Sequence, residues 1–278
     1  METLVSAREL SANLDNPAWL VFDCRFVLSA TGAGEAGYEA GHIPGAFYIS
    51  LDKDLSTPHI PGRSGRHPLP EKSAWIGRVR QLGITPDKQV VLYDDTGGAI
   101  AGRMWWMLRW IGHANAALLD GGLKAWQQAG LPLTTDKPVA RQPGDADYAA
   151  MPALVKILSA DAIDGKAQLL LDARELPRFR GDTEPLDPVA GHIPGALCSP
   201  FSANLDADGR FKSPQQLREK FAAAAGTNKP VVCYCGSGVT AAHNILAMKI
   251  AGLEEPALYP GSWSDWITDP RRPVATGE

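Results

Sequence analysis

The sequence lacks the features that mark membrane, secreted and nucleic-acid-binding proteins. No apolar run approaches the roughly 20 residues that span a bilayer, and residues 1–10 have neither a basic start nor a continuous apolar stretch. We therefore expect no membrane partner, no signal peptide and a cytoplasmic location. The formal net charge is −4 and there is no long basic run, which argues against nucleic acid as a partner.

Cysteine is also scarce, with four residues in a chain of 278. Four cysteines do not make a disulfide scaffold in a chain of this size. Cys233 and Cys235 lie two residues apart, but no second Cys/His pair stands at ligand spacing, so we expect no metal. No nucleotide-binding motif is present either, and we expect no cofactor.

What the chain does contain is a long internal repeat. Gly41-His42-Ile43-Pro44-Gly45-Ala46 recurs without change at Gly191–Ala196, and three further blocks recur in the same order. These blocks are Phe22–Arg25 with Leu171–Arg174, Val90–Asp94 with Val231–Cys235, and Asp120–Trp126 with Pro260–Trp266. A period this long indicates two tandem copies of one domain rather than a solenoid. We expect domains at 1–135 and 150–278, joined by a linker within 134–151 that lacks apolar periodicity.

Each copy alternates short apolar runs with helix-like segments. The predicted strands are Trp19–Phe22, Gln89–Tyr93 and Ala116–Leu119 in the first copy, and Gln168–Leu171, Pro230–Tyr234 and Pro256–Tyr259 in the second. Apolar runs between helices are typical of a buried parallel sheet. The fold class expected is therefore α/β, with a mainly parallel sheet flanked by helices in each copy.

The strongest chemical signal is the stretch Val231-Val232-Cys233-Tyr234-Cys235-Gly236-Ser237-Gly238-Val239-Thr240. It predicts a strand, a tight loop and a helix, with Cys235 where loop N–H groups and a helix N-terminus converge. Such surroundings favour a thiolate, which is the nucleophilic form. An inert structural cysteine is the alternative. The position that matches Cys235 in the first copy is Asp94, so we expect one active site per chain.

Together these motifs identify a resemblance that covers nearly the whole chain. Tandem domains with D-x-R…GHIPGA, a CGSGVT loop and a closing GSW-x-x-W resemble the two-domain sulfurtransferases of the rhodanese and 3-mercaptopyruvate sulfurtransferase family. The resemblance implies two tandem rhodanese-like domains, of which the N-terminal one is inactive. It also implies that sulfur moves from a small donor to a thiol or cyanide through a Cys235 persulfide, a covalent double displacement. A thioredoxin-like protein is one candidate acceptor.

The CGSGVT loop resembles the mercaptopyruvate type, so 3-mercaptopyruvate is the favoured donor and thiosulfate the alternative. A sulfur carrier or redox-sensing binding protein is a second class that the intact loop permits. A phosphatase is disfavoured, because the residue six positions after Cys235 is Ala241 rather than a phosphate-clamping arginine.

The same resemblance implies roles for particular residues. Ser237 would act with His67 and Asp52, with Asp54 as a substitute for Asp52, and Arg178 would bind the donor's carboxylate or sulfonate. The loop residues that would cradle the persulfide anion are Gly236, Gly238, Val239 and Thr240. A second arginine is expected shortly before GHIPGA, but residues 184–190 contain none, and Arg180 is the candidate replacement.

Several repeated residues are better explained by structure than by catalysis. His42 and His192 occur in both copies, including the copy without the cysteine. The pairs Asp23/Arg25 and Asp172/Arg174 do so as well. We therefore predict packing or turn hydrogen bonds for the histidines, and buried or interdomain ion pairs for the others.

Overall fold

The computed structural model describes residues 3–139 and 141–278, which form two compact units. Unit 1 contains the described residues up to Thr57 together with Pro70–Leu154 and Ala207–Arg210. Unit 2 contains Pro58–Leu69, Val155–Asp206 and Phe211–Glu278. Residues 58–69 thus group with the second unit although they lie in the first half of the sequence. The repeat along the chain does not reveal this grouping.

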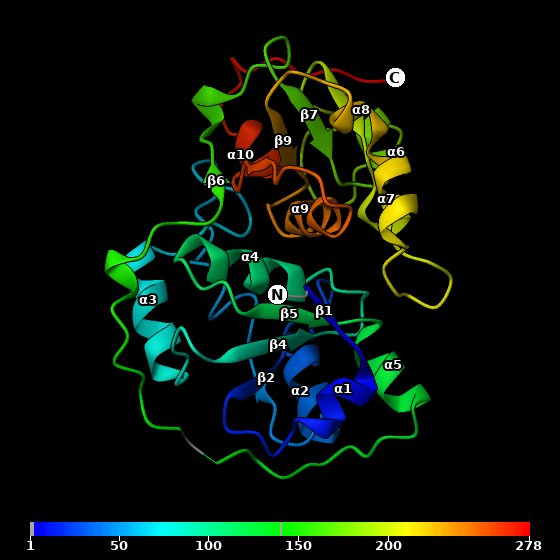
Figure 1. Ribbon diagram of the computed structural model, residues 1–278. Helices are drawn as coiled ribbons and strands as arrows, with labels where there is room; N and C mark the ends of the chain where they lie inside the picture. The colour runs from blue at the N-terminus through cyan, green and yellow to red at the C-terminus, as the bar shows by residue number, and fades with distance from the viewer. Residues whose placement is uncertain (1–2, 140) are drawn as a thin grey trace. The chain divides into compact units, whose positions relative to one another are not determined.

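Unit 1 is built on a five-stranded parallel sheet in the order β1-β5-β4-β2-β3. Figure 1 labels β1, β5, β4 and β2 of this sheet. Its elements are β1 (Leu4–Val5), α1 (Ala7–Ala12), β2 (Trp19–Asp23), α2 (Ala33–Ala40), β3 (Phe47–Tyr48), α3 (Lys72–Gln81), β4 (Gln89–Tyr93), α4 (Ala101–Trp110), β5 (Ala116–Leu119), α5 (Gly122–Gln128) and the 3-10 turn η1 (Tyr148–Ala150). The apolar runs predicted as strands are β2, β4 and β5.

Helices cover both faces of the unit 1 sheet, as a parallel sheet with continuous apolar strands requires. On one face Leu10 of α1 and Trp126 of α5 pack against Val21, Val91 and Ala117 of the sheet. Helix α4 lies on the other face, against β4 and β5 (Figure 1).

Unit 2 repeats this architecture, with a parallel sheet in the order β6-β10-β9-β7-β8. Its elements are β6 (Lys156–Ile157), η2 (Ala160–Ala162), β7 (Leu169–Asp172), α6 (Leu176–Arg180), β8 (Ala196–Cys198), η3 (Phe201–Asn204), α7 (Pro214–Lys220), α8 (Ala222–Ala225), β9 (Val231–Tyr234), α9 (Thr240–Ile250), β10 (Ala257–Leu258) and α10 (Ser262–Trp266). Ser213 and Gln216 form the capping box that starts α7.

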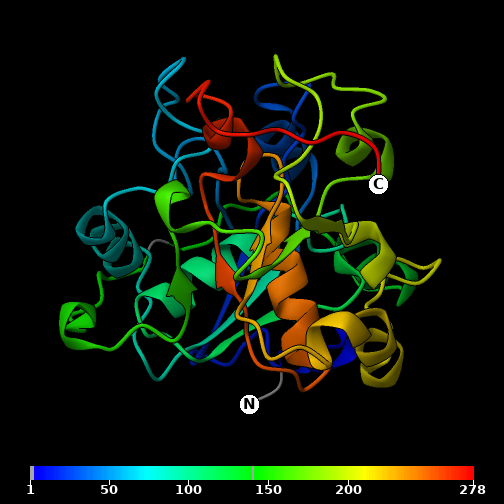
Figure 2. The same ribbon diagram turned by 90° about the horizontal axis from the view of Figure 1, so that it is seen from above.

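The two faces of the unit 2 sheet are covered by different helices. Helix α9, orange in Figure 2, packs against β9 and β10. Phe179 of α6 and Trp263 of α10 pack with Leu170 and Val232 on the opposite face. The segments that follow β7, β9 and β10 all leave the carboxyl edge of this sheet, where open α/β sheets place their sites.

The residues shared by both copies have structural contacts, as predicted. Arg25 pairs with Asp23, and Arg174 with Asp172, each at 2.7 Å and each within its own unit. His42 Nδ1 lies 2.8 Å from the Tyr38 carbonyl oxygen, and His192 Nδ1 lies 2.8 Å from that of Phe179. These matching contacts stabilise the turns around GHIPGA in both units.

No helix within residues 3–139 and 141–278 combines the length and the apolar character needed to cross a bilayer.

Candidate functional site

Cys235 follows β9 directly, and the loop 235–239 connects that strand to α9. Cys235 is only 1% exposed, so it is shielded from bulk water. The loop backbone is attached to α10, because Trp263 donates its N–H to the Cys235 carbonyl at 3.0 Å and Ser264 donates to that of Gly236 at 2.9 Å. The position of Cys235 is therefore fixed by an element that begins 27 residues further along the chain.

The Cys235 sulfur accepts a backbone hydrogen bond from the loop. The Gly238 N–H donates to Sγ at 3.2 Å. Gly238 adopts φ +76, and a Cβ there would lie 2.1 Å from the Pro260 carbonyl oxygen, so the position requires glycine. An amide aimed at the sulfur stabilises negative charge on it.

Ser262 is a site residue that the sequence reasoning missed. Its hydroxyl accepts the Cys235 N–H at 3.0 Å and donates to the Tyr259 carbonyl at 2.9 Å. Among the described residues Ser262 is the only non-glycine with positive φ, at 56°, a strained conformation for a residue with a Cβ. The repeat carried a signal, because Gly122 stands at the matching position of the first copy.

The structure brings Ser237 and His67 together. His67 Nδ1 lies 2.8 Å from the Ser237 hydroxyl oxygen, and both side chains are buried. His67 belongs to the segment 58–69, which is part of unit 2. A histidine that contacts a hydroxyl can hold or exchange its proton at this point of the loop.

The two carboxylates expected to complete this group lie in unit 1. Asp54 accepts the Ser50 N–H and the Arg78 Nε–H, both at 2.8 Å, so its oxygens hold a local turn and an ion pair. Asp52 is exposed. The role of either carboxylate with His67 stays a prediction from the resemblance.

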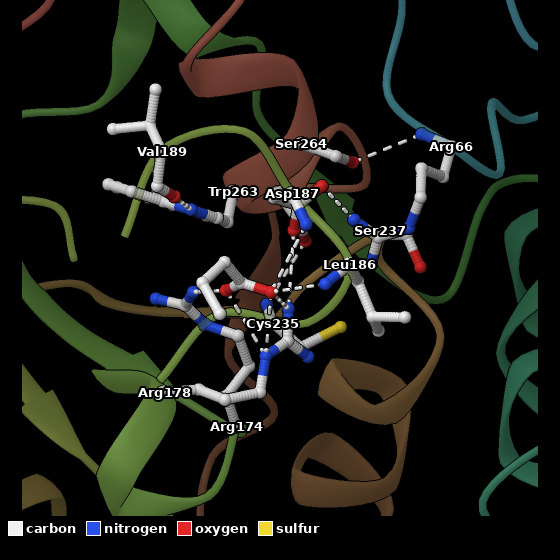
Figure 3. A network of polar contacts seen from close by, with 12 residues as sticks. Arg66, Arg174, Arg178, Leu186, Asp187, Val189, Cys235, Ser237, Trp263 and Ser264 are labelled. Atoms are coloured by element: carbon white, nitrogen blue, oxygen red, sulfur yellow. Dashed lines mark hydrogen bonds and ion pairs between the residues drawn. The ribbon is translucent and has the colours of Figure 1, made fainter. Parts of the chain in front are cut away.

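Arg178 lies in a network of arginines and carboxylates beside the Cys235 loop (Figure 3). Its Nη2 donates to Glu184 at 2.6 Å and to Asp187 at 3.2 Å. The other oxygen of Asp187 pairs with Arg66, whose backbone N–H donates to the Ser264 hydroxyl at 3.0 Å. Burial works against ionisation of Glu184, but the attraction and hydrogen bonds of Arg178, together with the backbone N–H groups of Leu186 and Asp187, lower its pKa.

Arg180 does not take the place of the missing second arginine. Its guanidinium pairs with the exposed Glu278 near the chain end. The arginine that the structure brings beside Arg178 is Arg66, which precedes His67 in the segment 58–69. It lies about 120 residues before the segment 184–190 in which the resemblance predicts a second arginine.

The other three cysteines are poor nucleophiles. Burial raises the pKa of Cys233 to about 12 and that of Cys198 to about 11, and it raises the pKa of Cys24 well above its ordinary value. These thiols stay protonated at neutral pH. Within the described parts of the chain, no group of three or more His, Cys, Asp or Glu side chains is placed to hold a metal ion.

Asp94 shows what the matching loop of unit 1 can hold. Its Oδ1 accepts the N–H groups of Thr96 and Gly98, and its Oδ2 accepts those of Ile100 and Ala101, at 2.8–2.9 Å. Leu123 donates to the Asp94 carbonyl, as Trp263 does to that of Cys235. This loop conformation therefore places several amides around a buried negative charge.

Comparisons with known proteins agree with this architecture. The family model described as a rhodanese-like domain matches residues 6–129 and 155–269. The chain is 50% identical over 285 residues to a probable 3-mercaptopyruvate sulfurtransferase of Pseudomonas aeruginosa, covering 99% of this chain and 98% of the relative. It is 41% identical to a putative thiosulfate sulfurtransferase, SseB, of Mycobacterium tuberculosis, covering 99% and 98%.

A solved structure is similar over the same length. The 3-mercaptopyruvate sulfotransferase SseA from Escherichia coli superposes with a TM-score of 0.77 at 31% identity, over 95% of this chain and all of the other. The repeat, the two parallel sheets and the cysteine loop are thus accounted for together, and the chain belongs to the rhodanese-like sulfurtransferase family, with two tandem rhodanese-like domains.

Proposed function

We propose that the protein transfers sulfur from 3-mercaptopyruvate to a thiol or to cyanide through a persulfide on Cys235. The observation that carries the proposal is the arrangement of loop 235–239. Cys235 Sγ accepts a hydrogen bond from the Gly238 N–H, and the Ser237 hydroxyl of the same loop is hydrogen-bonded to His67. A nucleophile and a proton-holding group are thereby available at one place.

In the first half-reaction the Cys235 thiolate attacks the donor's thiol sulfur. A sulfur–sulfur bond forms and the carbon–sulfur bond breaks, with its electron pair passing to pyruvate enolate. A proton then converts the enolate to pyruvate. Negative charge develops on the carbonyl oxygen, and a hydrogen bond from the Ser237 hydroxyl would stabilise it. His67, with Asp52 as its expected partner, would orient that hydroxyl.

The covalent intermediate is a persulfide, whose outer sulfur is anionic. The loop residues Gly236, Gly238, Val239 and Thr240 are proposed to cradle it with their backbone amides. The four amides that surround the Asp94 carboxylate in unit 1 support this role, because the repeat gives both loops the same place in the fold.

In the second half-reaction an acceptor thiolate or cyanide attacks the outer sulfur. The new bond carries that sulfur to the acceptor, and the electron pair of the broken sulfur–sulfur bond returns to Cys235 as thiolate. A thioredoxin-like dithiol is proposed as the protein acceptor. We also propose a cytoplasmic location, where such dithiols stay reduced, and domain boundaries at 1–135 and 150–278.

Thiosulfate is the alternative donor. The Mycobacterium tuberculosis relative is named for it, and Asp187 stands in the segment where the resemblance expects an arginine. With this donor the thiolate would take the outer sulfur and release sulfite, so no enolate would form. Ser237 and His67 would then matter less.

Steady-state rates with each donor, and cyanide as acceptor, distinguish the two. We expect a higher kcat/KM for 3-mercaptopyruvate and a larger loss in Ser237→Ala with that donor than with thiosulfate. A large preference for thiosulfate would reverse the donor assignment. Failure to turn over either donor, combined with a specific protein complex, would favour a carrier or redox sensor.

The covalent step has its own measurement. Intact mass after donor treatment should rise by one sulfur atom in the wild type and in Cys198→Ser, and should stay unchanged in Cys235→Ser. Cys198 is the matched control because it is a thiol of the same unit with a raised pKa. A gain of sulfur that persists in Cys235→Ser would refute the mechanism.

A further inference from the structure

Two guanidinium groups lie against the residue that follows the nucleophile. A Cβ at Gly236 would lie 2.8 Å from Arg66 Nη2 and 3.5 Å from Arg178 Nη1. The bare backbone of Gly236 is what allows the two cations to approach the loop so closely. Any anion held between these guanidiniums is therefore adjacent to Cys235.

Arg66 is fixed at its base and along one edge. Its backbone N–H donates to the Ser264 hydroxyl, and its Nη1 pairs with Asp187. The preceding Gly65 packs so closely on α10 that a Cβ there would lie 2.7 Å from the Gly261 carbonyl oxygen. These contacts hold the guanidinium in place before any ligand arrives, which lowers the entropic cost of binding.

Among the described residues, the protein contacts of Arg66 leave two of its guanidinium nitrogens, Nε and Nη2, without a hydrogen bond, and Nη2 is the one that lies near the loop. Arg66 Nε is buried and has no hydrogen-bond partner. Within residues 3–139 and 141–278, Arg66 Nη2 and Arg178 Nη1, the two nitrogens near Gly236, also make no hydrogen bond. Arg178 uses its Nε and Nη2 on Glu184 and Asp187. Of these three nitrogens Arg66 Nε is the buried one, and a buried donor without an acceptor is costly unless a ligand supplies one.

Asp187 joins the two arginines. One carboxylate oxygen pairs with Arg66 and the other with Arg178 Nη2 (Figure 3). This carboxylate is 3% exposed, so its attraction to both cations is weakly screened. It acts as a positioning residue that keeps two like charges side by side.

We infer that Arg66 is a second anion-binding residue of the Cys235 site and that, with Arg178, it binds the carboxylate of the sulfur donor. The inference rests on the proposed function for the identity of that donor. A planar guanidinium matches a carboxylate with two parallel hydrogen bonds, and the sulfonate-like oxygens of thiosulfate offer the same acceptor chemistry. Arg66 thus supplies the second cation that residues 184–190 lack.

The test compares Arg66→Gln with Arg63→Gln, an exposed arginine of the same segment. Removing a hydrogen-bonding cation from a carboxylate should raise the KM for 3-mercaptopyruvate by about 10- to 100-fold while kcat changes little. Arg63→Gln should keep the wild-type KM. Arg66→Lys keeps the charge but loses the planar guanidinium, so its KM should lie between those of the wild type and Arg66→Gln.

The methyl ester of 3-mercaptopyruvate separates carboxylate binding from a merely structural role. Arg66→Gln should leave the KM for the ester unchanged. An equal loss with acid and ester, or equal KM values in Arg66→Gln and Arg63→Gln, would overturn the inference and leave the proposed function intact. Thiosulfate kinetics on the same variants show whether the site also takes that anion.

Should the wild type turn over neither donor, the proposed function fails and calorimetric binding of pyruvate still tests Arg66. Weaker pyruvate binding in Arg66→Gln than in Arg63→Gln would support the anion site. Equal binding would refute it.

Discussion

The Asp94 carboxylate accepts four backbone N–H groups of the loop that leads into α4, and Asp94→Asn removes half of this arrangement. The asparagine oxygen can keep one pair of amides. The NH2 group then faces the other pair, so two buried donors lose their acceptor. Either orientation of the amide has this result.

The magnitude follows from the number of bonds lost. A hydrogen bond to a charged group contributes about 1.5–3 kcal/mol, so losing two of them should lower the free energy of unfolding by about 3–6 kcal/mol. The neighbouring Asp95 is exposed, and Asp95→Asn is the matched control with the same chemical change. We expect that control to change stability by no more than about 0.5 kcal/mol.

The assay is urea denaturation of the full chain, with hydrogen exchange at the amides of β4 and α4 to assign the loss to unit 1. The carboxylate would have no special stabilising role if Asp94→Asn and Asp95→Asn lost the same free energy. A loss below about 1 kcal/mol would refute the bond-counting argument.

Three further predictions concern single residues. Ser262→Gly keeps the positive φ without strain but loses the hydroxyl that holds the Cys235 N–H, so kcat/KM for sulfur transfer should fall about tenfold, the equivalent of one hydrogen bond; an unchanged rate would contradict this. Burial lowers the pKa of His113 to about 4, so the folded protein should lose up to about 3 kcal/mol as pH falls from 6.5 to 4. Urea denaturation of His113→Gln should not show that loss of stability. The same pH dependence of stability in the variant and the wild type would contradict the prediction. Burial raises the pKa of Cys198 to about 11, so its alkylation by iodoacetamide should be slow at pH 8, and the rate should rise about tenfold per pH unit toward pH 11. The rate is measured by peptide mass spectrometry in the Cys235→Ser variant. A rate that levels off near pH 9 would show an ordinary thiol.

The sequence was sufficient for much of the fold because its signals are local or repeated. Continuous apolar runs such as Val90–Tyr93 and Val231–Tyr234 encode buried parallel strands. Ser213 and Gln216 encode a helix start. The recurrence of GHIPGA revealed the two copies, and the glycine-rich stretch after Cys235 predicted the strand, loop and helix around the nucleophile.

By itself the sequence indicated Cys235 as the candidate nucleophile and its neighbours within one loop. The tertiary structure decided which distant residues join it. Arg66 and His67 reach the loop because the segment 58–69 packs with unit 2, and Ser262 reaches it because β10 lies beside β9. Such contacts arise from long-range packing: the sequence indicates His67 only through the resemblance, carries a signal for Ser262 only in its repeat, and contains none for Arg66.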